Sequence, residues 1–476
     1  MKNRIWMGAA IGLLLAAGTS QANNLKVTNV TVVARNDSTA YVKFDIAWDN
    51  SWRFADINHD AAWVFFKVLP EGATDWQHVT LEGTGTNPTD YSIGSGTPIE
   101  LIVPTERVGL FVRRSGEGAG STAAQNVKAV WNFASNNLVK TGKVTLQAFA
   151  VEMVYVAEGA FYAGSGGSGV NEFTKTLINT VDPTVAPTGD PLAGGYPSGG
   201  VAFPAAAPST IYWPNGYAAF YCMKHEVTEG QWVDFFNSLT DAQKTTRDIT
   251  SSSGKNTDAV LNRNTVAWTT GDATTAARDR ACSYVSWADQ CAFADWAGLR
   301  PMTELEFEKA CRGPLDPVAN EYAWGNTTIS HTTAIVNNDG TGTDTATGGN
   351  CNYNSCTPDG PYRVGIYATN GASRVSAGAS HWGIMELSGN LYERTVTIGH
   401  ATGRAFTGLH GNGALTTAGE SDVSAWPPGG NGDGERGGAH YHGTAEARVS
   451  DRTYAAPNNV YSRHNGRGSR VVRTAP

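Results

Sequence analysis

The sequence predicts an α+β protein, in which an N-terminal β-sandwich precedes a loop-rich domain with a few short helices. Only 16% of its 476 residues are charged and 41% are hydrophobic, a balance typical of globular proteins with sizeable cores. Alternating polar and apolar residues, which are typical of strands, dominate the region before residue 151. The 55 glycines indicate many turns, and helix-start signals lie only in the middle of the chain.

Residues 1–22 have the pattern of a secretory signal peptide. Lys2 and Arg4 precede an apolar stretch at 5–17, and Ser20-Gln21-Ala22 forms a small-x-small cleavage site. The apolar stretch is too short for a membrane-spanning helix, and no later stretch is apolar enough to span. We therefore expect an exported protein without a membrane span, located in the periplasm, at the cell surface or outside the cell.

The charge balance excludes one class of partner. The chain has 35 basic and 43 acidic side chains, a net charge of −8, and no basic run. Because nucleic-acid phosphates require clustered Lys and Arg, we expect no nucleic-acid partner.

The six cysteines predict disulfides, because export leads to an oxidising compartment. Sequence alone leaves their connectivity open. Cys351 and Cys356 are close enough along the chain to close a small loop, and they are the best candidate pair.

Residues 23–150 are predicted to form the β-sandwich. From Tyr41 to Trp48 polar and apolar residues alternate, as in a half-buried strand. Further short apolar runs, separated by Gly, Pro and Asn turns, are found at 62–66, 101–103, 108–112 and 144–146.

Residues 151–476 are predicted to form the second domain, with three helices and long loops. Thr228 with Gln231, Ser286 with Asp289, and Thr303 with Glu306 have the spacing of capping boxes. Gly313 is placed to end the third helix.

A series of short blocks in this second domain resembles the formylglycine-generating enzyme (sulfatase-modifying factor) family. The blocks, in order, are Glu226-Val227-Thr228, Val285-Ser286-Trp287, Arg300-Pro301-Met302-Thr303-Glu304, Arg312-Gly313, Tyr322-Ala323-Trp324-Gly325-Asn326, Gly389-Asn390-Leu391-Tyr392-Glu393 and Arg436-Gly437-Gly438. The resemblance spans roughly Val151 to Arg473 and implies a variant of the C-type lectin fold.

The resemblance implies a loss of the family's oxidase chemistry. In the oxidases, two cysteines shortly after the Arg-Gly-Gly block bind copper, since soft thiolates select Cu(I). Here His442 and Ala447 stand at about those positions, and no cysteine follows Cys356. We therefore expect neither copper nor oxidase activity, although His440 and His442 leave open a metal-dependent oxidase of the same superfamily.

The resemblance also implies structural calcium. The expected ligands are Glu386 and Glu393 through carboxylates, and Gly389 and Leu391 through carbonyls, a set that suits a hard cation. A second calcium site would involve Asn352, Tyr353, Asp359 and Pro361.

The segment 436–473 is the candidate variable ligand-binding segment. Between its framework positions lie residue types favoured in recognition loops: His440, Tyr441, His442, Tyr454, Asn458, Asn459, Tyr461, Arg463, His464, Asn465 and Arg467. The stretches 440–445 and 453–469 lack Lys, Gln, Glu, Met and Trp. This bias resembles the variable proteins of diversity-generating retroelements, in which adenine-directed mutagenesis cannot reach those residue types.

These observations predict a secreted or surface-displayed protein that binds a protein or glycan ligand. Two alternatives remain: a metal-dependent oxidase, and a structural subunit of an extracellular assembly that self-associates through the β-sandwich.

Overall fold

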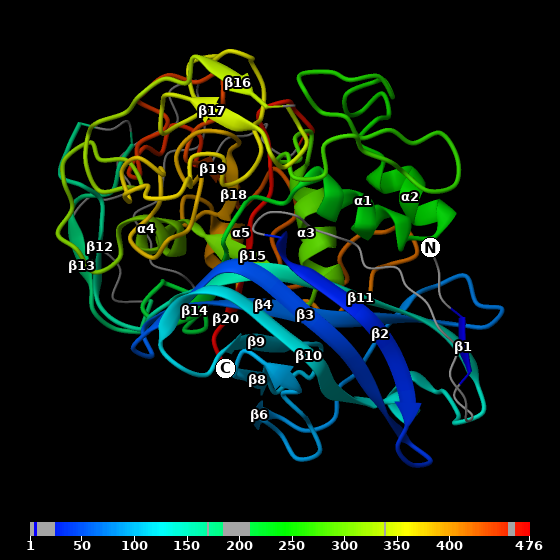
Figure 1. The fold of residues 1–476 in the computed structure, drawn as a ribbon. Helices are drawn as coiled ribbons and strands as arrows, with labels where there is room; N and C mark the ends of the chain where they lie inside the picture. The colour runs from blue at the N-terminus through cyan, green and yellow to red at the C-terminus, as the bar shows by residue number, and fades with distance from the viewer. Residues whose placement is uncertain (1–3, 7–23, 169–170, 184–209, 338, 456–461) are drawn as a thin grey trace.

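The computed structural model describes residues 4–6, 24–168, 171–183, 210–337, 339–455 and 462–476. The chain is mostly β with few helices, and Figure 1 shows long strands across one half and helices and loops in the other. The predicted signal peptide lies outside the described residues, except that β1 (Arg4–Trp6) pairs with the start of β11 (Lys143–Val156). None of the helices in the described ranges combines the length and apolar character needed to cross a membrane.

The N-terminal region consists of antiparallel strands, and the predicted alternation is confirmed. In β3, Val42, Phe44, Ile46 and Trp48 are buried while the residues between them are half-buried. The elements are β2 (Lys26–Ala34), β3 (Thr39–Phe54), β4 (Asn58–Pro70), β5 (Gln77–His78), β6 (Gly85–Thr86), β7 (Ser95–Gly96), β8 (Ile99–Val103), β9 (Leu110–Arg114), β10 (Gly118–Asn132), the 3-10 helix η2 (Phe133–Asn136) and β11 (Lys143–Val156).

Strand β4 is buried on both faces, which explains its continuous apolar run. Val64 and Phe66 point into the N-terminal core, where the rings of Phe44 and Phe66 lie 5.7 Å apart. Trp63 and Phe65 point the other way, into a second core that includes residues of helix α3 (Trp287–Trp296). The strand therefore joins the N-terminal region to the rest of the molecule.

The C-terminal part contains short strands and helices connected by long loops. The three predicted capping boxes are confirmed at Thr228, Ser286 and Thr303, and Gly313 ends α4 with a φ of 66°. The elements are β12 (Phe161–Ala163), β13 (Thr176–Ile178), β14 (Phe220–Met223), α1 (Glu229–Asn237), α2 (Asp241–Arg247), α3 (Trp287–Trp296), β15 (Arg300–Thr303), α4 (Glu304–Arg312), β16 (Ala334–Val336), β17 (Thr345–Thr347), β18 (Glu393–Val396), α5 (Ala401–Arg404), β19 (Asp433–Arg436) and β20 (Val471–Thr474).

The two parts share one continuous sheet. Its strand order is β19-β18-β15-β20-β14-β11-β4-β3-β10-β7. Strand β11 pairs with β4 from Val144 to Val154 and with β14 from Met153 to Val156. The boundary that the sequence places at residue 150 thus falls inside a single strand.

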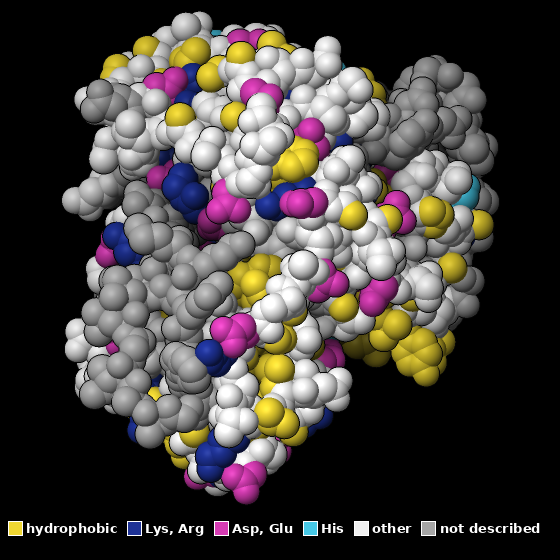
Figure 2. Space-filling view, turned by 90° about the vertical axis from the view of Figure 1, so that its right-hand side faces the viewer, with side chains coloured by type: hydrophobic (Ala, Val, Ile, Leu, Met, Phe, Trp, Pro, Cys, Tyr) yellow, Lys and Arg dark blue, Asp and Glu magenta, His cyan; other side chains and the backbone are white. Residues whose placement is uncertain are grey.

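The surface carries charges of both signs. On the face shown in Figure 2, Lys and Arg side chains lie interspersed with Asp and Glu side chains. Among the coloured residues of that face, no large patch of one charge is visible.

Candidate functional site

A buried ion-pair cluster fixes the C-terminal segment against helix α4. Glu304 accepts hydrogen bonds from Arg452 at 2.8 and 2.9 Å and from Arg436 at 3.1 Å, and all three side chains are 0% exposed. Arg436 also bonds Glu308 at 2.6 Å. Because an unpaired charge is costly in such an interior, these contacts fix where the segment after Arg436 begins.

The stretch from His440 to His442 is held by backbone hydrogen bonds on two sides. The His440 amide donates to the Asn390 carbonyl at 2.8 Å. Ser355 and Asn354 donate their amides to the carbonyls of His440 and His442, both at 2.7 Å. The stretch therefore lies against two loops that are distant in sequence.

Five rings form a cluster next to this stretch, which we call the aromatic face: Tyr392, Tyr441, His442, Tyr454 and His464. The hydroxyl of Tyr392 lies 3.3 Å from His442 Nε2, and that of Tyr441 lies 3.2 Å from His464 Nδ1. The rings of His442 and Tyr441 are 4.3 Å apart, and Tyr454 contacts both Tyr392 and His442 at 5.6 Å. Gly466 is required here, since a Cβ at that position would lie 2.5 Å from the Tyr441 ring.

The aromatic face is electrically neutral near pH 7. Burial lowers the pKa of His442 to about 4 and also lowers the pKa of His464. The neighbouring Arg467 is paired with Glu435 at 2.5 Å. The face therefore offers neutral imidazoles and phenols, which bind by ring contacts and hydrogen bonds.

The structure separates the predicted ligand-binding residues into two groups. Tyr441, His442, Tyr454 and His464 come together in the aromatic face, and Asn465 is half-buried beside them in sequence. Three others bind acids of this chain: His440 with Asp359 at 2.8 Å, Arg463 with Asp289 at 2.7 Å, and Arg467 with Glu435. Asn458, Asn459 and Tyr461 lie outside the described residues.

Arg463 is expected to contribute to stability through its partner. Asp289 is buried, and although burial raises its pKa, Arg463 and Arg247 together lower it from 3.8 to about 2. We expect Arg463→Ala to cost about 2 kcal/mol of unfolding free energy at pH 7, the range for a hydrogen-bonded charge. Because the folded-state pKa is depressed, this contribution is present above pH about 4 and is lost as the pH falls toward 2.

Urea unfolding of the wild type and Arg463→Ala at pH 7 and at pH 2.5 would measure this difference. A variant as stable as the wild type at pH 7 would contradict the structural role of Arg463.

A cluster of buried carboxylates lies beneath the block at 389–393. Glu393 accepts from Arg470 at 2.7 Å, but its Oε2 is buried without a hydrogen-bond partner. Glu226 accepts from the Leu391 amide at 2.9 Å, and Glu386 accepts from the Gly365 amide at 2.7 Å. Burial, together with the charges of Glu393 and Glu386, raises the pKa of Glu226 well above its usual value. Glu226 belongs to the first of the family blocks but was not among the calcium ligands expected from the sequence.

Comparison with known protein families shows the family to which the chain belongs. The model of the Sulfatase-modifying factor enzyme 1-like domain matches residues 147–475, more than half of the chain. The chain belongs to this family.

Two curated proteins are similar to it over a short stretch. The formylglycine-generating enzyme of Thermomonospora curvata is 54% identical over 43 residues, which cover 9% of this chain and 14% of that enzyme. That of Streptomyces coelicolor is 51% identical over 43 residues, which cover 9% of this chain and 13% of the enzyme. The chain thus matches a small part of each relative's length.

The prediction of disulfides is wrong for this member of the sulfatase-modifying factor family. All six cysteines lie in described parts of the chain, and all are buried free thiols. Cys351 lies 3.1 Å from the Ser388 carbonyl and Cys356 lies 3.1 Å from the Tyr353 carbonyl, so each thiol has its own backbone partner. Burial raises the pKa of Cys222 to about 12 and thereby disfavours the reactive thiolate there.

The predicted second calcium set is engaged by other groups. Arg263 donates to the Pro361 carbonyl at 3.0 Å, and Asp359 is paired with His440. The Asn352 amide nitrogen donates to the Gly360 carbonyl at 2.9 Å, whereas Tyr353 is buried. The Arg263 guanidinium thus already supplies positive charge next to the Pro361 carbonyl, where a calcium ion was expected.

Side chains alone do not form a metal site in the described part of the chain, since no group of three or more His, Cys, Asp or Glu residues there is suited to a metal ion. A cation at Glu386 and Glu393 would therefore need the backbone carbonyls of Gly389 and Leu391 that the family resemblance implies.

Proposed function

We propose that this protein is a secreted or surface-displayed ligand-binding protein, built on the C-type-lectin-like scaffold of the family with a β-sandwich as its N-terminal part. The aromatic face is the observation that carries the proposal. It is built around the stretch where the oxidases have their copper cysteines, and His442 and Ala447 stand at about those positions instead. The six thiols of this chain are buried elsewhere.

The chemistry of the aromatic face suits a protein or glycan ligand. Tyr and His rings offer contact area at modest entropic cost, and their polar atoms offer adaptable hydrogen bonds. Since the imidazoles are neutral at pH 7, binding would depend little on salt.

Removing two rings of the face should weaken binding strongly. Tyr441→Ala combined with Tyr454→Ala deletes half-buried phenols, and loss of central aromatic contacts costs about 2 kcal/mol or more, roughly 30-fold in Kd. A glycan array and a panel of extracellular proteins would be probed with the wild type, this double variant and a control variant.

The matched control is Tyr212→Ala, whose ring is 70% exposed and lies outside the aromatic face. A partner captured by the wild type and by Tyr212→Ala but lost by the double variant supports the proposal. A partner that the double variant retains at full affinity contradicts it.

The proposed diversification of the segment can be tested in DNA. A near-copy of the codons for 436–473 that differs mainly at adenines, beside a reverse transcriptase gene, would support a retroelement-diversified variable protein. Flanking DNA without such a copy would count against diversification and leave the binding proposal standing.

A second candidate function is a metal-dependent oxidase, and one observation favours it. His440 Nε2 and His442 Nδ1 are both buried without a hydrogen-bond partner. Stoichiometric copper or iron that is lost in His442→Ala, together with O₂ consumption in the presence of a thiol substrate, would establish this alternative over the binding proposal.

We also propose structural calcium at the carboxylate cluster, and two observations support it. A cation would give Glu393 Oε2 a partner and would reduce the electrostatic repulsion between Glu226 and Glu393.

Calcium at a hundred-fold excess over its Kd should stabilise the fold by about 2.7 kcal/mol. Thermal unfolding with calcium and with EDTA would measure this shift, which Glu386→Gln should reduce. Equal melting temperatures for the wild type in both conditions would exclude calcium.

A further inference from the structure

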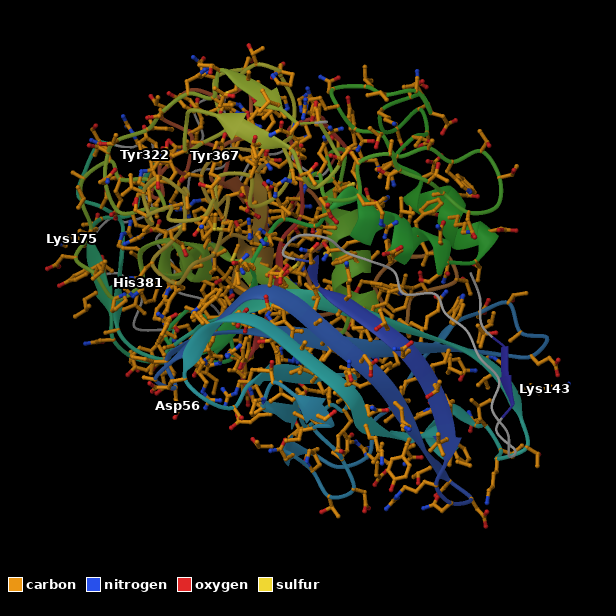
Figure 3. All side chains as sticks on the ribbon, in the orientation of Figure 1. Asp56, Lys143, Lys175, Tyr322, Tyr367 and His381 are labelled. Atoms are coloured by element: carbon orange, nitrogen blue, oxygen red, sulfur yellow. The ribbon has the colours of Figure 1, made fainter. Side chains whose placement is uncertain are left out.

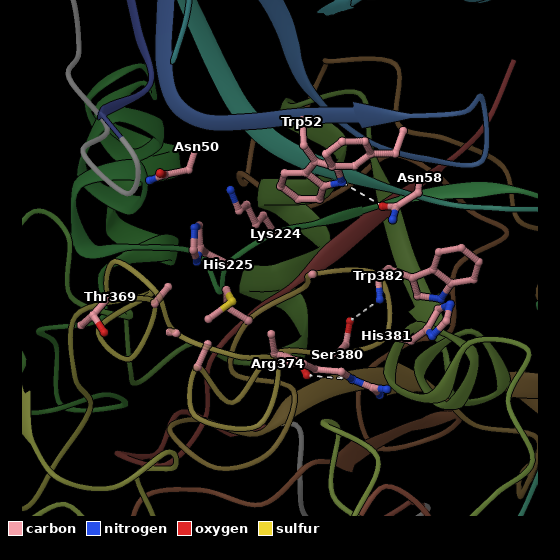
Figure 4. A pocket seen from close by; sticks show the side chains of 17 residues that line it. Asn50, Trp52, Asn58, Lys224, His225, Thr369, Arg374, Ser380, His381 and Trp382 are labelled. Atoms are coloured by element: carbon pink, nitrogen blue, oxygen red, sulfur yellow. Dashed lines mark hydrogen bonds between the residues drawn. The ribbon is translucent and has the colours of Figure 1, made fainter. Parts of the chain in front are cut away.

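A pocket lies between the turn of the β3–β4 hairpin and the loop at 368–385. Its volume is about 450 Å³, within the range of small-molecule sites. Figure 4 shows Trp52 and Asn58 of the hairpin on one side and Arg374, Ser380 and Trp382 on the other. Both parts of the molecule therefore contribute walls to the pocket.

One part of the lining is apolar and aromatic. Trp52, Phe54 and Trp382 supply rings, and several alanines line the opposite loop. The Trp52 ring is fixed, because its N–H donates to Asn58 at 2.8 Å and the Lys224 ammonium lies 4.8 Å from the ring centre. Phe54, in contrast, is 49% exposed. A flat apolar group would find preformed contacts here.

The polar part of the lining is cationic. Lys224 and Arg374 line the pocket, and no Asp or Glu does. Lys224 has Glu152 at 3.4 Å, but among the described residues Arg374 makes no ion pair, and its guanidinium donates to backbone carbonyls such as Ala323 O at 2.9 Å. The Glu321 carboxylate acts on this charge electrostatically but is paired with Arg312, which leaves Arg374 without an ion-pair partner of its own among the described residues.

His225 adds a polar group that lacks a partner. Its side chain is 7% exposed and lines the pocket, yet its Nε2 has no hydrogen-bond partner. Its other ring nitrogen lies 3.5 Å from Glu386. The wall of the pocket at His225 therefore contains an imidazole whose Nε2 is closed off from solvent.

We propose that this pocket binds a small organic carboxylate with a flat apolar body. The carboxylate would pair with Arg374, and the body would contact Phe54 and Trp382. The pocket shares no residue with the aromatic face. In Figure 3, the labelled His381 lies on the loop side and Asp56 on the hairpin turn. Because residues of both the hairpin and the loop at 368–385 line it, this second site needs both parts of the chain.

Three probes with the same ring test the charge. Isothermal titration of the full-length protein would compare 1-naphthoate, neutral 1-naphthalenemethanol and cationic 1-naphthylmethylammonium. We expect naphthoate to bind at least about tenfold more tightly than the alcohol, the effect of one charge-assisted hydrogen bond. Arg374→Gln should abolish this preference and Arg374→Lys should retain part of it.

Two variants of the hairpin test whether the ligand binds in this pocket. Phe54→Ala should weaken naphthoate several-fold, whereas Ile57→Ala, which removes a 62% exposed side chain outside the lining, should not. Both positions are exposed, so neither change should unfold the protein. Absence of saturation at millimolar naphthoate, equal affinity for the alcohol, or undiminished binding by Phe54→Ala would each overturn the proposal.

Discussion

Glu304→Gln is expected to reduce the free energy of unfolding by about 3–5 kcal/mol, the cost of breaking a buried ion pair from one side. Glutamine has the size of glutamate but no charge, so Arg452 would lose its carboxylate partner in a fully buried place. The Glu304 carboxylate also accepts hydrogen bonds from the Thr397 hydroxyl at 3.0 Å and the Ile398 amide at 2.8 Å. Urea unfolding followed by circular dichroism would measure the loss.

The control is Glu420→Gln, the same change at an exposed position, which should alter stability by less than about 0.5 kcal/mol. If Glu304→Gln were as stable as this control, the buried cluster would not hold the C-terminal segment in place.

Trp63→Ala is expected to cost about 3–5 kcal/mol and to loosen both halves of the molecule at once. The indole is fully buried, its N–H donates to the Ala297 carbonyl at 2.8 Å, and the Arg473 guanidinium lies 4.6 Å from the ring centre. Gly109 leaves space for the ring, since a Cβ there would lie 2.6 Å from it. Removing the ring thus opens a cavity between the N-terminal strands and α3.

Hydrogen exchange distinguishes this role from a general loss of stability. Trp131→Ala removes an equally large buried ring, but one that packs in the N-terminal core. Amide exchange in α3 should rise more in Trp63→Ala than in Trp131→Ala. Equal exchange in the two variants would show that Trp63 does not couple the halves.

Local signals predicted the local structure well. The capping boxes at Thr228, Ser286 and Thr303 fixed three helix starts, because side-chain and backbone partners lie three residues apart. Helix α2 was missed although Thr240 and Gln243 form the same box. The helix is short and polar, so it lacks the regular spacing of apolar residues by which a helix is predicted from sequence.

The site was only partly predictable, because its partners are distant in sequence. Residue type placed Arg463 among ligand-binding residues, yet its partner Asp289 lies 174 residues away. Glu226 gave no local sign of its contact with Leu391, which lies 165 residues away. Cysteine number and compartment predicted disulfides, but they carry no information about the separate carbonyl partners of the thiols.

The continuity of β11 limits how this protein could exchange modules in evolution or in the laboratory. A chimaera cut at residue 150 would sever a strand whose hydrogen bonds serve β4 on one side and β14 at its end. A replacement N-terminal module would have to bring a strand of matching register and an apolar surface equivalent to that of Trp63 and Phe65. Shuffling of this architecture is therefore restricted to donors that preserve the shared strand, while point changes at the aromatic face remain compatible with it.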